Sequence, residues 1–255
     1  MEFVPENQFE ESLMRAANDP AHRPQFYKDL CNADLFIIQH GKKAPESHER
    51  TTLKEGATIQ IQNIEHNGKP YIPVFSSLSR LQLVISEEVS YLGVNAIELM
   101  KFTQGAELLL NPGSDYGKEF TENEISSILD GSIWHPSESY IQKKEAKILL
   151  GQPKVYPMEL TTALSRLFKK NKNVKRAWVA HFHNPEDGQP PHTLLAIDAG
   201  DSYSEIAGEI GIVISNINIP NPPVDIIPIT GGGGLEDYFL NGEKPFYIKK
   251  FLGIF

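Results

Sequence analysis

The stretch of Thr58–Ser77 constrains the fold more than any other part of the chain. It reads TIQIQNIEHNGKPYIPVFSS, and Ile59 and Ile61 alternate with glutamines. This period of two predicts a strand with one buried face. The pair Asn67-Gly68 tolerates positive φ at both central positions of a tight turn, so it predicts a hairpin. The chain then returns through Tyr71–Phe75, an apolar second strand.

Breaker and capping residues punctuate the rest of the first half. Pro73 cannot donate to a sheet ladder, so we expect its strand at an edge or a bulge. Ser76-Ser77 and Asn95 are positioned to cap two helices. The spacing Thr121-x-x-Glu124 is a capping box, and Gly131 is placed to end the helix that it opens.

The second half alternates helical and strand patterns. A helix is expected from Pro157, with a stripe of apolar residues at helical spacing: Leu160, Ala163, Leu164, Leu167 and Phe168. A second capping box, Ser202-x-x-Glu205, precedes another helix. The order helix, strand, strand, helix, strand, helix predicts an α+β fold. We expect two mixed-sheet domains, each covered by helices: residues 1–130, a linker over 131–144, and residues 145–255.

Four segments carry a family resemblance. They are YIPVFSSLSRL at Tyr71–Leu81, LLLNPGSDYG at Leu108–Gly117, PxxLxxALxxLFKKNxxVKRAWVA at Pro157–Ala180 and VDIIPI at Val224–Ile229. The chain resembles the SseB family, bacterial proteins called "enhanced serine sensitivity" proteins after an overproduction phenotype. The resemblance spans an amino-terminal and a carboxy-terminal domain. The shared motifs are packing and turn signatures rather than catalytic ones. The resemblance therefore implies a fold, and it does not imply a particular molecular function.

Composition and charge narrow the classes of partner. The net charge is −9, and residues 1–144 hold 21 acidic and 13 basic side chains. This half would repel phosphate backbones, which disfavours nucleic-acid binding, and would attract a basic protein. Cys31 is the single cysteine, which excludes an internal disulfide and a thiolate zinc site and fits a reducing cytoplasm. The amino terminus is acidic and polar, and no apolar run could span a membrane, so we expect no membrane association.

Few residues group in a way that predicts chemistry. His181 and His183 share one face of a strand, and His192 could add a third metal ligand, but we expect no metal. Gly231–Gly234 could cradle an anion, although a flexible connector is the simpler interpretation. The basic residues between Arg166 and Arg176 are expected to be a solvated helix end, with an acidic partner or RNA as the alternative.

These patterns predict a protein that binds another protein and catalyses no reaction. We expect no catalytic residue and no cofactor, and a role in neutralising or modulating a bacterial partner such as a toxin. The alternative is an enzyme or small-molecule sensor linked to serine or other amino-acid metabolism. The predicted partner-binding residues are Tyr71, Phe75, Arg80, Asp115, Tyr116, Glu119 and Glu122.

Overall fold

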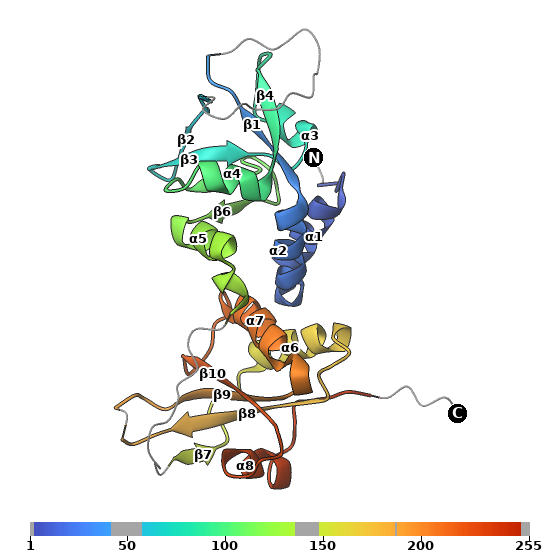
Figure 1. Ribbon diagram of the computed structural model, residues 1–255, viewed down its shortest axis with the longest axis vertical. Helices are drawn as coiled ribbons and strands as arrows, with labels where there is room; N and C mark the ends of the chain where they lie inside the picture. The colour runs from blue at the N-terminus through green and yellow to red at the C-terminus, as the bar shows by residue number, and fades with distance from the viewer. Residues whose placement is uncertain (1–2, 42–57, 136–147, 187, 251–255) are drawn as a thin grey trace, which may run out of the picture. The chain divides into compact units, whose positions relative to one another are not determined.

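The protein divides into two α+β units in a computed structural model, which confirms the predicted fold class (Figure 1). The structure describes residues 3–41, 58–135, 148–186 and 188–250. By contacts, unit 1 comprises residues 1–18 and 23–132, and unit 2 comprises residues 19–22 and 133–255. The linker predicted over 131–144 lies mostly outside the described residues, and its boundaries stay a prediction.

Unit 1 contains five helices and six strands among its described residues. The helices are α1 Gln8–Asn18, α2 Arg23–Asn32, α3 Leu78–Gln82, α4 Ala96–Phe102 and α5 Glu122–Asp130. The strands are β1 Asp34–Ile38, β2 Ile64–His66, β3 Lys69–Val74, β4 Tyr91–Asn95, β5 Leu108–Leu110 and β6 Lys118–Phe120. The 3-10 turn η2, Ser132–Trp134, follows α5 and spans the boundary at which unit 2 begins.

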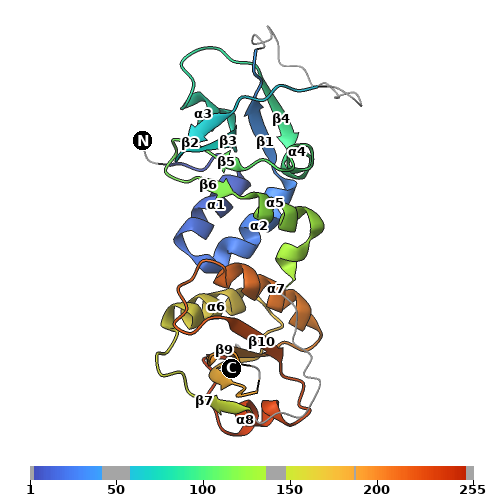
Figure 2. The ribbon, with the colours of Figure 1, turned by 90° about the vertical axis from the view of Figure 1, so that its left-hand side faces the viewer.

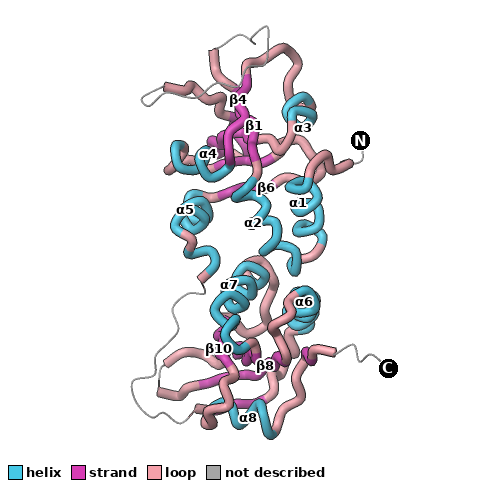
Figure 3. The backbone as a smooth tube through the Cα atoms, turned by 45° about the vertical axis from the view of Figure 1, so that its right-hand side comes forward, coloured by secondary structure: helices cyan, strands magenta, loops and turns pink. Residues whose placement is uncertain are grey.

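Two sheets organise unit 1. Strands β2-β3-β5-β6 form a mixed sheet in which β3 and β5 are parallel, and β1 pairs antiparallel with β4. An isolated bridge between Phe36 and Phe75 joins the two sheets. Helices α1 and α2 pack against each other (Figure 3), and the ring of Phe26 on α2 stacks on Phe120 of β6 at 6.3 Å. The helices therefore share one core with the mixed sheet.

The predicted hairpin forms, but it is shorter than the alternating pattern indicated. Asn67 and Gly68 have φ of 52° and 76°, as a tight turn requires. Strand β2 begins only at Ile64, and Ile61 makes an isolated bridge to Gln39. The residues before Ile64 bond to the end of β1 and the segment after it instead of to β3, so β2 starts later than expected. The alternation of apolar and polar residues does not reveal which strand is the partner.

Pro73 was expected at a sheet edge or a bulge, and it lies instead in an interior strand. It sits opposite Leu109 of β5, to which β3 bonds through Ile72 and Val74. On the other side of β3, β2 ends opposite Tyr71 and the bridge to β1 begins at Phe75. Pro73 therefore occupies the gap between two short partners, where no ladder hydrogen bond is lost.

Unit 2 contains three α-helices and five strands among its described residues. The helices are α6 Met158–Lys170, α7 Tyr203–Ile214 and α8 Leu235–Asn241, with 3-10 turns η1 Pro20–His22 and η3 Gly200–Ser202. The strands are β7 Leu149–Gly151, β8 Arg176–His183, β9 His192–Asp198, β10 Val224–Pro228 and β11 Tyr247–Ile248.

The sheet of unit 2 runs β10-β9-β8-β11, with β7 also on β8. Helices α6 and α7 cover one face and α8 covers the other (Figures 1 and 2). The apolar stripe predicted for α6 is buried against the first face. Trp178 and Phe239 pack on the second face, with ring centroids 6.3 Å apart. Successive apolar side chains of β8 point to opposite faces of the sheet, so this strand contributes to both cores.

Candidate functional site

Tyr71 and Glu119 are the two predicted partner-binding residues that the fold brings into contact. The Tyr71 hydroxyl donates to Glu119 Oε2 at 2.9 Å, and His66 Nε2 lies 3.3 Å from Glu119 Oε1. The bond to the Glu119 carboxylate, together with burial and the charge of Glu107, raises the pKa of Tyr71 to about 12. Strands β2, β3 and β6 thus present one polar cluster with an exposed carboxylate, Glu119.

Asp115, Tyr116 and Glu122 lie on the segment around β6. Asp115 and Glu122 are exposed, and Glu122 is in the first turn of α5, where a negative charge complements the helix dipole. Tyr116 is half-buried, with its ring edge-on to Phe3 at 4.9 Å and its hydroxyl accepting from Asn18 Nδ2 at 3.1 Å. The two acids are available to solvent, whereas Tyr116 is tied to the amino-terminal segment.

Phe75 and Arg80 are buried, and both have structural contacts in unit 1. Phe75 is fully buried, and its backbone exchanges hydrogen bonds of 2.9 and 2.8 Å with Phe36. Arg80 is 8% exposed and follows the cap of α3 by Ser77. A partner-binding role would need both side chains at the protein surface, whereas these contacts bury them. The two roles therefore stay predictions.

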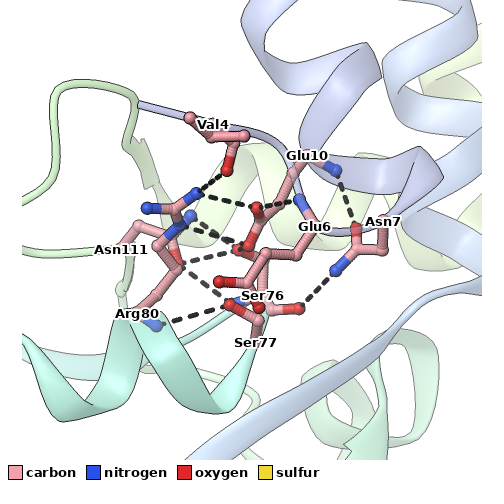
Figure 4. A network of polar contacts seen from close by, with 8 residues as sticks. All are labelled: Val4, Glu6, Asn7, Glu10, Ser76, Ser77, Arg80 and Asn111. Atoms are coloured by element: carbon pink, nitrogen blue, oxygen red, sulfur yellow. Dashed lines mark hydrogen bonds and ion pairs between the residues drawn. The ribbon is translucent and has the colours of Figure 1, made fainter. Parts of the chain in front are cut away.

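Arg80 belongs to a buried polar network that joins three distant parts of unit 1 (Figure 4). It donates to Glu10 at 3.0 Å and to the Val4 carbonyl at 2.6 Å. Ser76 donates to Glu10 at 2.7 Å, and its backbone amide donates to Asn111 Oδ1 at 2.9 Å. Phe3 lies over the guanidinium, with 3.9 Å between Arg80 Cζ and the ring centroid.

Glu10 is the charged centre of this network, and it is fully buried. Burial opposes its ionisation, but the hydrogen bonds from Arg80, Ser76 and the Glu6 amide outweigh burial and lower the pKa of Glu10. The carboxylate is therefore ionised at neutral pH. A buried ion pair with satisfied oxygens holds α1 against α3.

A cavity of about 470 Å³ opens beside this network. Its lining comes from the start of α1, the end of α2, β1 and the end of β3: Asn7, Gln8, Phe9, Asp29, Asn32, Ala33, Asp34, Phe36 and Ser76. Two of these residues are acidic and none is basic. Its size is typical of small-ligand pockets. No pattern in the sequence pointed to the cavity, because its walls are separated by up to about seventy residues.

The three histidines do not converge. Phe182 pairs with His192, and His181 pairs with Thr193, so His192 faces the side opposite His181 and His183. His192 instead contacts Asp225 at 2.9 Å. The third-ligand hypothesis is therefore wrong. His181 Nε2 and His183 Nδ1 are buried without a hydrogen bond from the described residues, which contain no cluster of three metal-ligating side chains.

Thr230 and the first glycine of the run Gly231–Gly234 form an anion cradle, and a side chain of the same chain occupies it. Glu236 accepts from the amides of Thr230 and Gly231 at 2.7 and 2.6 Å and from the Thr230 hydroxyl at 2.8 Å. Burial alone would raise the pKa of Glu236, but these hydrogen bonds lower it. The loop is consequently held by its own carboxylate.

The basic cluster at the end of α6 is partly neutralised. Arg166 pairs with Asp19 at 3.4 Å, and Arg176 donates twice to Asp198, at 3.1 and 3.0 Å. Lys169, Lys172 and Lys175 are exposed.

Cys31 is half-buried, and burial raises the pKa of its thiol, which lowers its nucleophilicity at neutral pH.

Across the described ranges, no helix has the length and apolarity to cross a membrane.

The comparisons with known proteins give one consistent family. Residues 9–127 match the model of the SseB protein N-terminal domain, and residues 142–249 match that of the SseB protein C-terminal domain.

Full-length relatives agree with the domain matches. Protein SseB of Escherichia coli (strain K12) is 30% identical over 250 residues, covering 97% of this chain and 94% of the relative. Protein SseB of Shigella flexneri has the same identity and coverage. No solved structure matches this chain. Because both domain models match in order and together span most of the sequence, the chain belongs to the SseB family.

Proposed function

We propose that this protein works in the cytoplasm by binding a basic partner protein, such as a toxin or a metabolic enzyme, and catalyses no reaction itself. The observation that carries the proposal is the placement of three exposed carboxylates, Asp115, Glu119 and Glu122, within eight residues of unit 1. Glu119 lies in strand β6 and Glu122 in the capped first turn of α5, so these two charges are held on regular backbone, and Asp115 lies three residues before β6.

An exposed group of like charges attracts an oppositely charged partner over distances of about 10 Å at moderate salt. Such attraction speeds the encounter more than it tightens the final complex. The bond from Tyr71 fixes Glu119 and reduces the entropy that this side chain loses on binding. The excess of acidic residues in the first half supports the same sign of partner.

The test begins with affinity purification from the native bacterium and identification of the captured protein. Association and dissociation of that protein are then measured by surface plasmon resonance at increasing salt. We expect association to slow as salt rises, while dissociation changes less. The triple variant Asp115→Lys, Glu119→Lys and Glu122→Lys should slow association at low salt by about tenfold or more.

A matched variant controls for net charge and for helix-start acids. Glu159, Asp201 and Glu205 are exposed acids near helix starts in unit 2, and their reversal to lysine changes the net charge equally. We expect this control to leave association nearly unchanged. Equal slowing by both triple variants, or rates that ignore salt, would contradict the proposal.

A further inference from the structure

We propose that the cavity of unit 1 binds an alkylammonium or alkylguanidinium group. Asp29 and Asp34 are among its nine lining residues, and none of the nine is basic. A volume of about 470 Å³ accommodates such a group with several carbon atoms attached. This site is separate from the exposed acids around β6, and it concerns a small cationic group rather than the charge of a whole partner.

The hydrogen-bond directions around the cavity leave acceptors to be filled. Gln8 and Gln25 both donate to Asp29 Oδ1, at 3.1 and 2.9 Å. Asn32 turns its amide nitrogen to the Lys28 carbonyl at 2.8 Å. Among the described residues, none donates a hydrogen bond to Asp29 Oδ2, Gln8 Oε1 or Asn32 Oδ1. A ligand that completes this lining must supply hydrogen-bond donors.

The helix geometry adds to the negative potential at the same place. Asp29 lies in the last turn of α2, where an acidic side chain is unfavourable beside the negative end of the helix dipole. Asp34 begins β1 two residues after the helix ends, and Asn95 holds that junction by donating to the carbonyls of Cys31 and Ala33. A cation is the ligand that relieves this repulsion.

Two aromatic rings give the cavity an apolar wall. Phe9 is buried, and Phe36 is half-buried with its ring next to Gly93. A β-carbon at Gly93 would lie 3.2 Å from the Phe36 ring, so the glycine allows this ring position. Aromatic carbon next to carboxylates suits an aliphatic stem that carries a cationic head.

The probes are butylguanidine, its neutral isostere butylurea, and an acetylated Gly-Arg-Gly amide with its citrulline counterpart. Binding is followed by amide chemical shifts of the full-length protein. We expect saturable binding of butylguanidine that shifts residues 7–9, 29–36 and 76, with butylurea at least about tenfold weaker. Stronger binding of the arginine peptide would assign the cation to a polypeptide side chain, and weaker binding to a free small molecule.

The variant Asp29→Asn with Asp34→Asn removes both charges and keeps the shape of the lining. The amide oxygen introduced at position 29 still accepts from the two glutamines, so thermal unfolding should change little, and binding should weaken by about tenfold or more. The control, Glu65→Gln with Glu98→Gln, alters two exposed acids of the same unit outside the cavity. The proposal is overturned if no cationic probe binds, if butylurea binds equally, or if both double variants behave alike.

Discussion

The contact between Glu10 and Arg80 is the residue-scale feature on which unit 1 depends most. The two side chains are buried, lie 3.0 Å apart and are seventy positions apart in the chain. A buried pair stabilises less than its geometry implies, because both charges lose water. Removing one partner is costly, since the other charge remains buried and unpaired.

We therefore expect Glu10→Gln to lower the free energy of unfolding by about 3 kcal/mol. Glutamine keeps the shape but leaves the Arg80 charge without its carboxylate. Urea denaturation at neutral pH measures the change. In the double variant Glu10→Gln with Arg80→Met the cost should be less than the sum of the two single costs, because no charge is then stranded. Additive costs would show that the pair is not coupled.

The pH dependence of stability follows from the same pair. The folded protein holds the pKa of Glu10 below its ordinary value of 4.5, so its stabilisation is complete above that value and is lost as pH falls through the folded pKa. We expect the stability difference between wild type and Glu10→Gln to be smaller at about pH 3 than at about pH 6. A difference that stays constant over this range would count against an ionised Glu10.

Arg80 also shows what the residue pattern could not reveal. A basic residue after a capping serine reads equally well as a solvated surface charge, and only the fold brings Glu10 to it. Tyr71 and Glu119 are similar, because their hydroxyl–carboxylate contact joins β3 to β6 over 48 positions. The cavity could not be anticipated for the same reason. Long-range pairing between polar residues leaves no local periodicity.

At the scale of elements, local signals were reliable where the chain alone decides. Ser77, Asn95 and Thr121 cap their helices as predicted, and Gly131 ends α5 with φ of 80°. The second capping box is the exception. Ser202 makes no cap hydrogen bond, because the 3-10 turn η3 precedes α7 and its hydroxyl accepts from Asn173 at 2.8 Å.

These two capping boxes make a matched pair for mutagenesis. Thr121→Ala should lower the free energy of unfolding by about 1 kcal/mol, because it removes the acceptor of the Glu124 amide. Ser202→Ala should lower the free energy of unfolding by only a few tenths of a kcal/mol, since it removes only the solvent-exposed hydrogen bond from the Asn173 side chain. Chemical denaturation of both variants decides the matter, and equal losses would contradict the cap assignment.

The glycine run gives a second element-scale prediction. Glu236→Ala should speed hydrogen exchange at the amides of Thr230 and Gly231, because the carboxylate that protects them is gone. Asp237→Ala offers a comparison, since Asp237 accepts from Gly234 instead. It should leave the Thr230 and Gly231 amides protected. Unchanged exchange in the Glu236 variant would show that the cradle is not closed by this side chain.

At the scale of the whole molecule, the two-unit architecture follows from where apolar stripes and breakers alternate in the sequence. The acidic half and the more neutral half each hold a mixed sheet with its own helices. Residues 19–22 belong to unit 2, where Ala21 is buried in the core with α6 and α7. This placement could not have been predicted, because in the sequence Ala21 looks like part of a simple turn.

Limited proteolysis tests the predicted boundary at residues 131–144. We expect early cleavage within this segment or within residues 41–56, because both sequences are polar and rich in breaker residues, which favours nicking. Mass spectrometry of the fragments locates the cuts. Cleavage that spares both segments and falls within β3 or β8 instead would contradict the domain organisation.

The polar network of unit 1 also sets an order of events during translation. Glu10 leaves the ribosome early, whereas Arg80 follows seventy residues later and Asn111 after about another thirty. At synthesis rates of about 5–20 residues per second, the network around Glu10, which Asn111 joins through Ser76, is complete roughly 5–20 s after Glu10 is made. Helix α1 therefore spends that interval hydrated on the nascent chain, and unit 1 closes around it only when β5 has been made.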